Sequence, residues 1–340
     1  MKHYAKLLAL VLTLSLLAGV ILSVSAGTAI DPDRKCSVTI GPANFEELKE
    51  IDIEVDLYRV ASVDAYAQFT ALPGFESLDF SPKQEGDEKW QSEEQKAIEL
   101  IAAEDSTIVP TTTATIHHGT DRVYDMETGV YLALAHLPGA EKKDYIIRSE
   151  EDGKLYTYME TPEFAYTIVP TMISLPGSED GMTSSDNWEY DRIFSLKMDQ
   201  KNRFGDLIIR KTLNTYSEIQ GDVTFVFDIQ ATLDGKLVYS NVEALIFDGP
   251  GPREIRVSHL PAGAEVTVTE VYSGASYKLT SDPTQTATII AEGMEGYPVS
   301  VSFTNDYDEK IEGGHGVINK FSHDGEKWNW EQDETPAPRP

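Results

Sequence analysis

The feature that most constrains the fold is an alternation of apolar and polar residues that recurs along most of the chain. Successive side chains of a strand point to opposite faces, so a period of two is typical of half-buried β-strands. Turn signals separate the runs, and Asp234-Gly235 has the composition of a two-residue hairpin turn between Gln230–Leu233 and Lys236–Tyr239. Short strands with turns about every ten residues predict an all-β sandwich architecture. The runs are Ile51–Val60, Val130–Leu137, Phe164–Val169, Asp206–Leu213, Val223–Ile229, Glu265–Tyr272, Thr286–Ile290 and Pro298–Tyr307.

One segment departs from this alternation. In the Glu-rich stretch Ser92–Ala103, the apolar residues follow a helical spacing, which predicts one surface helix inserted in the first domain. The polar stretch Lys197–Arg203 has no strand pattern, and we place a domain boundary there, since 340 residues allow two domains. The predicted domains are 36–202 and 205–308. The remaining residues, 309–340, read as a Gly-rich linker, a hairpin around Asp324-Gly325 and a disordered Pro-rich tail.

The first 26 residues have the pattern of an export signal. A basic start is followed by an apolar run from Leu7 to Val24, and then by small residues that end at Ala26. Cleavage between Ala26 and Gly27 would give a mature chain outside the cytoplasm. The alternative is an uncleaved membrane anchor, because the run is almost long enough to span a bilayer.

Composition excludes several functions. The net charge of −29 repels phosphate backbones and anionic lipid surfaces, so we expect no nucleic-acid partner. The single cysteine, Cys36, rules out an internal disulfide framework and a cysteine-rich zinc site; a buried apolar role is the usual one for such a thiol. The chain has no nucleophile elbow and no phosphate loop, so we expect no cofactor, no metal and no small-molecule substrate.

Three polar residues stand where strand alternation requires apolar ones. Lys211 shares a face with Leu207 and Ile209, Asn305 with Phe303, and Glu270 with the alternating valines before it. Burying each alone would cost several kcal/mol for a charge and about 1–3 kcal/mol for an unsatisfied polar group. Buried together, they can react, because desolvation favours the neutral forms of an amine and a carboxyl. Lys211 would attack the Asn305 amide while Glu270 shuttles protons, leaving an isopeptide bond and ammonia.

Three motifs in this region resemble those of CnaB-type domains, the streptococcal pilin isopeptide-linkage domains of Gram-positive pilins and surface adhesins. They are Gly205–Thr212, Val266–Glu270 and Val301–Tyr307, in the order of the family. The resemblance implies tandem Ig-like β-sandwiches, and a self-formed bond between Lys211 and Asn305 with Glu270 as its catalytic group. The long acidic stretch Ser240–Ser258 departs from the family pattern.

The first domain is similar to pilin N-terminal domains in three segments, Asp56–Ala61, Thr128–Leu132 and Ile173–Pro176 with Trp188–Asp191. In backbone pilins such a segment leads to a lysine that a sortase joins to the next subunit. Lys197 is the equivalent here, although the family's "YPKN" is missing, and an ordinary exposed lysine is the alternative. The first strand alternates Cys36, Val38 and Ile40 against polar residues, so we expect no internal bond in this domain.

Two functions are consistent with these features. The first is a secreted, pilin-like surface protein of a Gram-positive bacterium, non-enzymatic apart from forming its own bond, with other pilin subunits or a sortase as partners. The second is a secreted adhesin module for a glycan or host protein. No sorting signal is found within this sequence to favour the first. We also expect the Trp328- and Trp330-containing hairpin to dock on a domain or on a neighbouring subunit.

Overall fold

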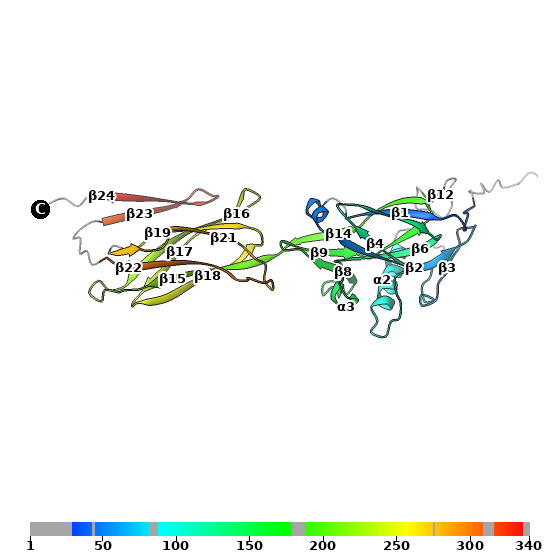
Figure 1. The fold of residues 1–340 in the computed structure, drawn as a ribbon, viewed down its shortest axis with the longest axis horizontal. Helices are drawn as coiled ribbons and strands as arrows, with labels where there is room; N and C mark the ends of the chain where they lie inside the picture. Colours follow the sequence, from blue (N-terminus) through cyan, green and yellow to red (C-terminus); the bar gives the residue numbers. More distant parts are fainter. Residues whose placement is uncertain are drawn as a thin grey trace, which may run out of the picture. The chain divides into compact units, whose positions relative to one another are not determined.

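A computed structural model describes residues 29–42, 45–81, 88–178, 188–274, 276–308 and 316–335. It confirms the all-β prediction, since strands make up most of the described chain (Figure 1). The chain separates into two compact units, one of residues 1–158 with 167–198, and one of residues 159–166 with 199–340. The domain limits drawn from the sequence stay a prediction. The predicted cleavage site at Ala26 and Gly27 lies outside the described residues.

The first unit is built around the long strand β2, which lies between β6 and both β3 and β4 in a five-stranded sheet. All eight residues of β6 are buried, because β10 and β2 flank it and apolar side chains cover both of its faces. A three-stranded sheet in the order β13-β1-β5 accompanies it. The strands are β1 (Cys36–Gly41), β2 (Ile53–Val63), β3 (Phe69–Ala71), β4 (Thr112–Ile116), β5 (Asp121–Met126), β6 (Gly129–His136), β10 (Thr171–Leu175), β11 (Gly177–Ser178), β12 (Trp188–Glu189) and β13 (Asp191–Ser195).

The inserted helix is α2 (Glu88–Ala102), which starts earlier than the predicted Ser92. Its residues Ala97, Ile98 and Ile101 are buried in the core formed by β2 and β6, which fixes the apolar face that the sequence indicates. Two short helical segments were not predicted, the 3-10 helix η1 (Glu46–Glu50) and α3 (Lys142–Tyr145). None of the helices in the described ranges has the length and apolar content needed to cross a bilayer.

A further sheet has the order β14-β9-β8-β7. The prediction that Lys197–Arg203 contains no strand was wrong, because β14 (Lys197–Asn202) occupies this stretch. Its residues are mostly exposed and polar, so they lack the apolar alternation, yet the backbone still pairs with β9 as an edge strand. The partners are β7 (Ile146–Arg148), β8 (Leu155–Glu160) and β9 (Phe164–Val169).

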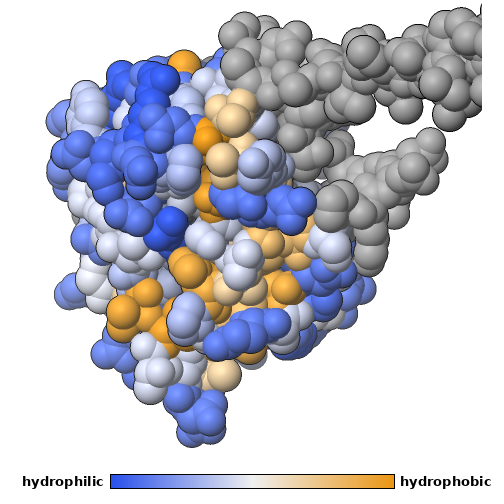
Figure 2. Space-filling model, turned by 90° about the vertical axis from the view of Figure 1, so that its right-hand side faces the viewer, coloured by the Kyte–Doolittle hydropathy of each residue, from blue (hydrophilic) through white to orange (hydrophobic). Residues whose placement is uncertain are grey.

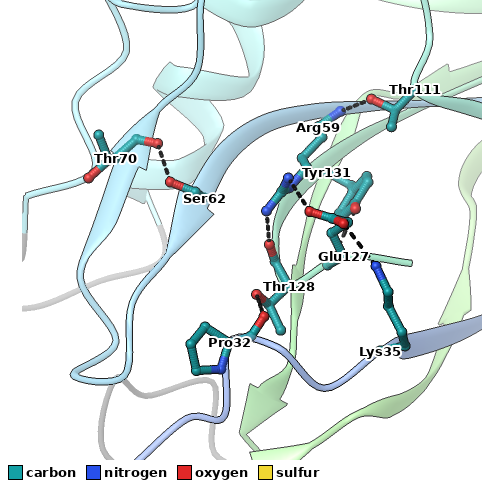
Figure 3. Close-up of polar contacts among 9 residues, drawn as sticks. All are labelled: Pro32, Lys35, Arg59, Ser62, Thr70, Thr111, Glu127, Thr128 and Tyr131. Carbon is teal, nitrogen blue, oxygen red and sulfur yellow. Dashed lines mark hydrogen bonds and ion pairs between the residues drawn. The ribbon is translucent and has the colours of Figure 1, made fainter. Parts of the chain in front are cut away.

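A polar network holds the start of the described chain against the first unit (Figure 3). Glu127 accepts from Lys35 at 2.8 Å and from Arg59 at 3.0 Å. The Arg59 guanidinium also donates to the Thr128 carbonyl, and the Thr128 hydroxyl donates to the Pro32 carbonyl at 3.0 Å. The backbone between Pro32 and Lys35 is thereby tied to the turn that precedes β6. On the face of this unit that Figure 2 shows, most of the surface is hydrophilic, and apolar side chains gather in a band across it.

The second unit contains a sandwich of two four-stranded sheets, in the orders β18-β15-β22-β20 and β17-β16-β19-β21. Asp234 and Gly235 both have positive φ and close the predicted hairpin between β16 and β17. The stretch Ser240–Ser258, which departs from the family pattern, forms parts of the strands β17 and β18, and each of them pairs within one of the two sheets. The strands are β15 (Phe204–Leu213), β16 (Val223–Leu233), β17 (Lys236–Phe247), β18 (Gly251–Pro261), β19 (Glu265–Tyr272), β20 (Tyr277–Leu279), β21 (Thr284–Thr288), β22 (Val299–Tyr307) and the terminal hairpin β23 (Gly316–His323) and β24 (Trp328–Thr335).

Close backbone packing at the start of β15 requires a glycine. A Cβ atom on Gly205 would lie 1.9 Å from the carbonyl oxygen of Ile290, which is backbone and cannot rotate away. Gly205→Ala should therefore lower the free energy of unfolding of the full chain by at least about 1–3 kcal/mol, measured by denaturant titration. The matched control is Gly249→Ala, because nothing lies within 4 Å of its Cβ position. Equal stability of the two variants would contradict this packing.

Candidate functional site

The three sequence-predicted site residues come from three strands of the second unit. Lys211 is near the end of β15, Asn305 near the end of β22, and Glu270 on β19 of the opposite sheet. The strands β15 and β22 are parallel neighbours, and their register places Asn305 opposite Leu213, two residues from Lys211. All three side chains point into the sandwich, as the alternation predicts, and the residues are 0%, 6% and 0% exposed for Lys211, Glu270 and Asn305.

The side chains form a closed set of contacts. The Lys211 amine donates both to Oε2 of Glu270 and to Oδ1 of Asn305. The Asn305 amide nitrogen donates to Oε1 of Glu270 at 2.7 Å. Each oxygen of the Glu270 carboxylate therefore contacts one of the other two groups, and the carboxylate connects the nitrogen of the amine with the nitrogen of the amide.

Apolar side chains surround this set. The Lys211 nitrogen lies 4.4 Å from the centre of the Phe225 ring and 5.8 Å from that of Phe227, and Phe303 is fully buried beside them. Burial lowers the pKa of Lys211 from 10.5 to about 8, although the nearby Glu270 carboxylate acts in the opposite direction. The neutral amine is therefore populated about two orders of magnitude more at neutral pH than it would be on an ordinary lysine.

The set combines a nucleophile, an electrophile and a proton carrier in a water-free interior. The amine nitrogen touches the oxygen of the amide whose carbon it would attack, which is the proximity that acyl transfer needs. The carboxylate contacts both the nitrogen that must lose protons and the nitrogen that must gain one.

The other sequence-predicted residues lie apart from this set. Lys197 is exposed at the start of β14, in the first unit. Cys36 begins β1 and is 2% exposed; burial raises its pKa to about 11, so the thiol stays protonated at neutral pH. Val38 and Ile40 are buried on the same strand, which agrees with the apolar alternation of the first strand.

One family model matches the part of the chain that holds the site. A family model described as a domain of unknown function, DUF5979, matches residues 207–308, which include all three residues. A search of curated proteins found no significant match.

The solved structures that the chain matches are Gram-positive pilins and surface adhesins. The minor pilin GBS52 of Streptococcus agalactiae is 12% identical over 80% of this chain and 96% of that one, with a TM-score of 0.22. The major pilin SpaA of Corynebacterium diphtheriae is 13% identical over 68% and 62%, with a TM-score of 0.28. An adhesin of Mobiluncus mulieris with disulfide, isopeptide and ester cross-links is 10% identical over 75% and 83%, with a TM-score of 0.29.

The first unit contains a buried charged pair that sequence reasoning missed, Asp56 on β2 and His136 at the end of β6. His136 Nδ1 lies 2.8 Å from the Leu137 carbonyl oxygen, and Nε2 lies 3.4 Å from Oδ2 of Asp56. Nδ1 lies within hydrogen-bond distance of a carbonyl, whereas Nε2 has no hydrogen-bond partner among the described residues and faces the Asp56 carboxylate as an ion pair, which favours the protonated ring. Thr113 donates to Asp56 at 2.6 Å, and Tyr145 stacks on the His136 ring. The sequence signal was His136 near the end of the apolar run Val130–Leu137, because Asp56 alternates with apolar residues just as Asp52 and Glu54 do.

The pair has opposite pKa shifts. Burial acts to lower the pKa of His136, but contacts with Asp56 and the Leu137 carbonyl outweigh it and raise the pKa above 6.5. Burial acts to raise the pKa of Asp56, but its bonds to His136 and Thr113 outweigh it and hold the pKa below 3.8. Glu54 Oε2 lies 3.9 Å from His136 Nδ1, and the Asp56 carboxylate interacts electrostatically with Lys142.

The stability of the first unit should depend on pH through this pair. The folded state holds the His136 proton more tightly than the unfolded state, so this contribution is complete below pH 6.5 and is lost as pH rises through the folded pKa. Through this one proton, the free energy of unfolding falls by at most about 1.4 kcal/mol for each pH unit. The Asp56 contribution is lost only as pH falls below 3.8. Calorimetry of the wild type and of His136→Gln should show a flatter alkaline slope in the variant, and parallel profiles would contradict the assignment.

Proposed function

We propose that the protein is a secreted, pilin-like structural protein of a Gram-positive cell surface, and that Lys211 and Asn305 join in an intramolecular isopeptide bond. The observation that carries the proposal is the buried set of Lys211, Glu270 and Asn305, in which every polar group contacts the other two. The CnaB-like motifs around these residues and the export pattern at the N-terminus support the surface location.

The proposed reaction balances without a cofactor. The Lys211 ammonium gives a proton to Glu270, and the neutral amine attacks the Asn305 side-chain carbonyl carbon. The C–N bond to the amide nitrogen then breaks as Glu270 returns that proton to the leaving nitrogen, and the carboxylate takes the second surplus proton from the attacking Lys211 nitrogen. One ammonia leaves, and the nitrogen of Lys211 and the carbon of Asn305 form a neutral amide. The apolar surroundings of Phe225 and Phe227 are compatible with that product, because it carries no charge.

The position of the bond suits a protein that bears tension. Lys211 and Asn305 lie near the carboxyl ends of two parallel neighbouring strands, β15 and β22. A pull applied before β15 and after β22 would pass along β15, across the bond and out of β22. The 94 positions of chain between the two residues would carry no load and could not unravel. The proposed partners are therefore other pilin subunits, joined by a sortase through the exposed Lys197.

The proposed bond has a direct mass signature. The folded wild-type protein should weigh about 17 Da less than its sequence, which is one ammonia lost in the condensation. Glu270→Ala should keep the full mass because it lacks the proton carrier, and Lys211→Met should keep it because it lacks the nucleophile. Intact-mass spectrometry of each folded protein provides the measurement.

Two substitutions in the same unit serve as controls for the mass. Glu254→Ala and Lys278→Ala replace the same residue types outside the buried set, and both should retain the 17 Da deficit. A wild-type protein that is folded at full sequence mass would disprove the bond.

Loss of the bond should also reduce stability. A cross-link that closes 94 positions of chain contributes about 4–5 kcal/mol in the chain-entropy model. Lys211→Met removes the cross-link and fills its space with an uncharged side chain, but it also leaves Glu270 and Asn305 buried without the amine. Its deficit in the free energy of unfolding therefore combines the missing constraint with these unpaired groups. The comparison is denaturant unfolding of the wild type, Lys211→Met and Lys278→Met. Similar midpoints for all three would mean that the second unit is not held by a cross-link.

A further inference from the structure

The two sheets of the second-unit sandwich have four edge strands, β17, β18, β20 and β21. An edge strand presents unpaired backbone groups, and short length, charged side chains or prolines protect it from pairing with another chain. β20 and β21 are short, with three and five residues. β18 carries an exposed proline and three exposed charged residues, Pro252, Arg253, Glu254 and Arg256. β17 is different, because it is twelve residues long and mostly uncharged.

β17 has little protection against pairing. Between Leu237 and Ile246 its one charged side chain is Glu243, whose carboxylate already accepts from the Asn241 amide at 2.8 Å. Leu237, Val238 and Ile246 are 37%, 42% and 56% exposed. Alternate backbone groups of β17 pair with β16, and the others point to the open edge of the sheet. β17 therefore offers a long, weakly charged edge with apolar side chains near both ends.

The terminal hairpin contacts the face of this sheet. The backbone N–H of Trp328 donates to the hydroxyl of Ser240 at 2.9 Å. Ser240 lies opposite Gln230, which alternates with the core residues Ile229 and Ala231, so its side chain is on the outer face. This contact agrees with the expectation that the hairpin docks on a domain. Among the described strands, β23 and β24 pair with each other and not with β17, so the edge of β17 stays open to another strand.

The sequence of β17 is complementary to itself when two copies of the strand run antiparallel. In the register that sets Val242 opposite Val242 of the other copy, Tyr239 lies opposite Leu245. Both of these side chains pack against the core of their own sandwich, so they point to the same side of the joined sheets. Asn241 lies opposite Glu243 of the other copy, which pairs an amide with a carboxylate. Within β17, this register sets no like charges opposite each other.

The two ends of the strand are complementary in the same register. The exposed apolar residues Leu237 and Val238 of one copy would meet Ile246 of the other, which removes apolar surface from water. Lys236 would come within one residue of Asp248 of the other copy, so an ion pair can form at each end. The one-residue shift of the β16–β17 ladder at Val238 changes these neighbours by no more than one position. A strand of a different protein would need the same pattern, whereas a second copy supplies it by symmetry.

We propose that two copies of the chain associate through β17, which pairs antiparallel with β17 of the other copy about a two-fold axis at Val242. The interface is isologous, since the same strand serves on both sides. Backbone hydrogen bonds join the two four-stranded sheets into one of eight strands. The net charge of −29 opposes association, and β17 contributes little to that repulsion. The interface is independent of the proposed bond, because Lys211 and Asn305 belong to the other sheet.

Charges placed at the two-fold axis test this pairing. Analytical ultracentrifugation over a concentration series should show the wild type approaching twice the chain mass. Val242→Lys and Val242→Glu should each stay monomeric where the wild type dimerises, because each sets two equal charges opposite each other. An equimolar mixture of the two variants should recover the dimer. A wild type that stays monomeric up to about 1 mM would overturn the proposal, and so would a mixture that stays monomeric.

The other edge of the same sheet provides the matched control. Thr286 is exposed on β21, so Thr286→Lys and Thr286→Glu should leave the dimer as stable as in the wild type. Circular dichroism checks that each variant keeps its β content. Loss of the dimer in both pairs of variants would contradict the assignment of the interface to β17.

A cysteine at the axis provides a second test that adds no charge. The native Cys36 is buried, so Val242→Cys adds one available thiol, and the pairing sets it opposite the same thiol of the other copy. Mild oxidation should give a disulfide-linked dimer on a non-reducing gel. Ile219→Cys, at a turn residue that is 93% exposed, should give far less of it. Equal dimer yields from the two variants would mean that collision alone forms the link, and would overturn the register at Val242.

Discussion

The burial of Lys211, Glu270 and Asn305 between two sheets is the interaction on which the second unit depends. A lysine that is 0% exposed is stable only if its charge is matched or removed. The unit meets this condition by placing the Glu270 carboxylate and the Asn305 amide in contact with the amine. The proposed bond would remove the charge altogether, because it replaces a buried ion and a buried amide by one neutral amide.

The two units handle buried charge in different ways. In the first unit, Asp56 and His136 form a buried ion pair, Thr113 donates to the carboxylate, and the Leu137 carbonyl lies 2.8 Å from Nδ1 of the ring. That arrangement titrates, so its contribution depends on pH. The bond proposed for the second unit would neither titrate nor exchange, which would suit a part of the chain that carries load.

Much of the second unit could be predicted from the sequence, because parity alone turned Lys211, Glu270 and Asn305 inward, and a turn of Asp234-Gly235 fixed one hairpin. Prediction from the sequence failed where the structure depends on pairing between segments that are far apart in the chain. The polar strand β14 forms because its backbone pairs with β9, and its sequence has no apolar alternation from which a strand could be predicted. Asp56 and His136 lie on strands that are far apart in the sequence. They become neighbours because β2 pairs with β6 in a register that sets Asp56 opposite Leu134, and neither strand's sequence alone reveals that register. The contact of the terminal hairpin with β17, from Trp328 to Ser240, joins residues 88 positions apart and has no local sequence signal.

A crystal structure of the protein purified from its folded, secreted form tests the central claim most directly. The account predicts continuous electron density between Nζ of Lys211 and Cγ of Asn305, with an amide C–N distance of about 1.3 Å and the Glu270 carboxyl still beside it. Separate lysine and asparagine side chains in van der Waals or hydrogen-bond contact, in a protein with an intact sandwich, would contradict it.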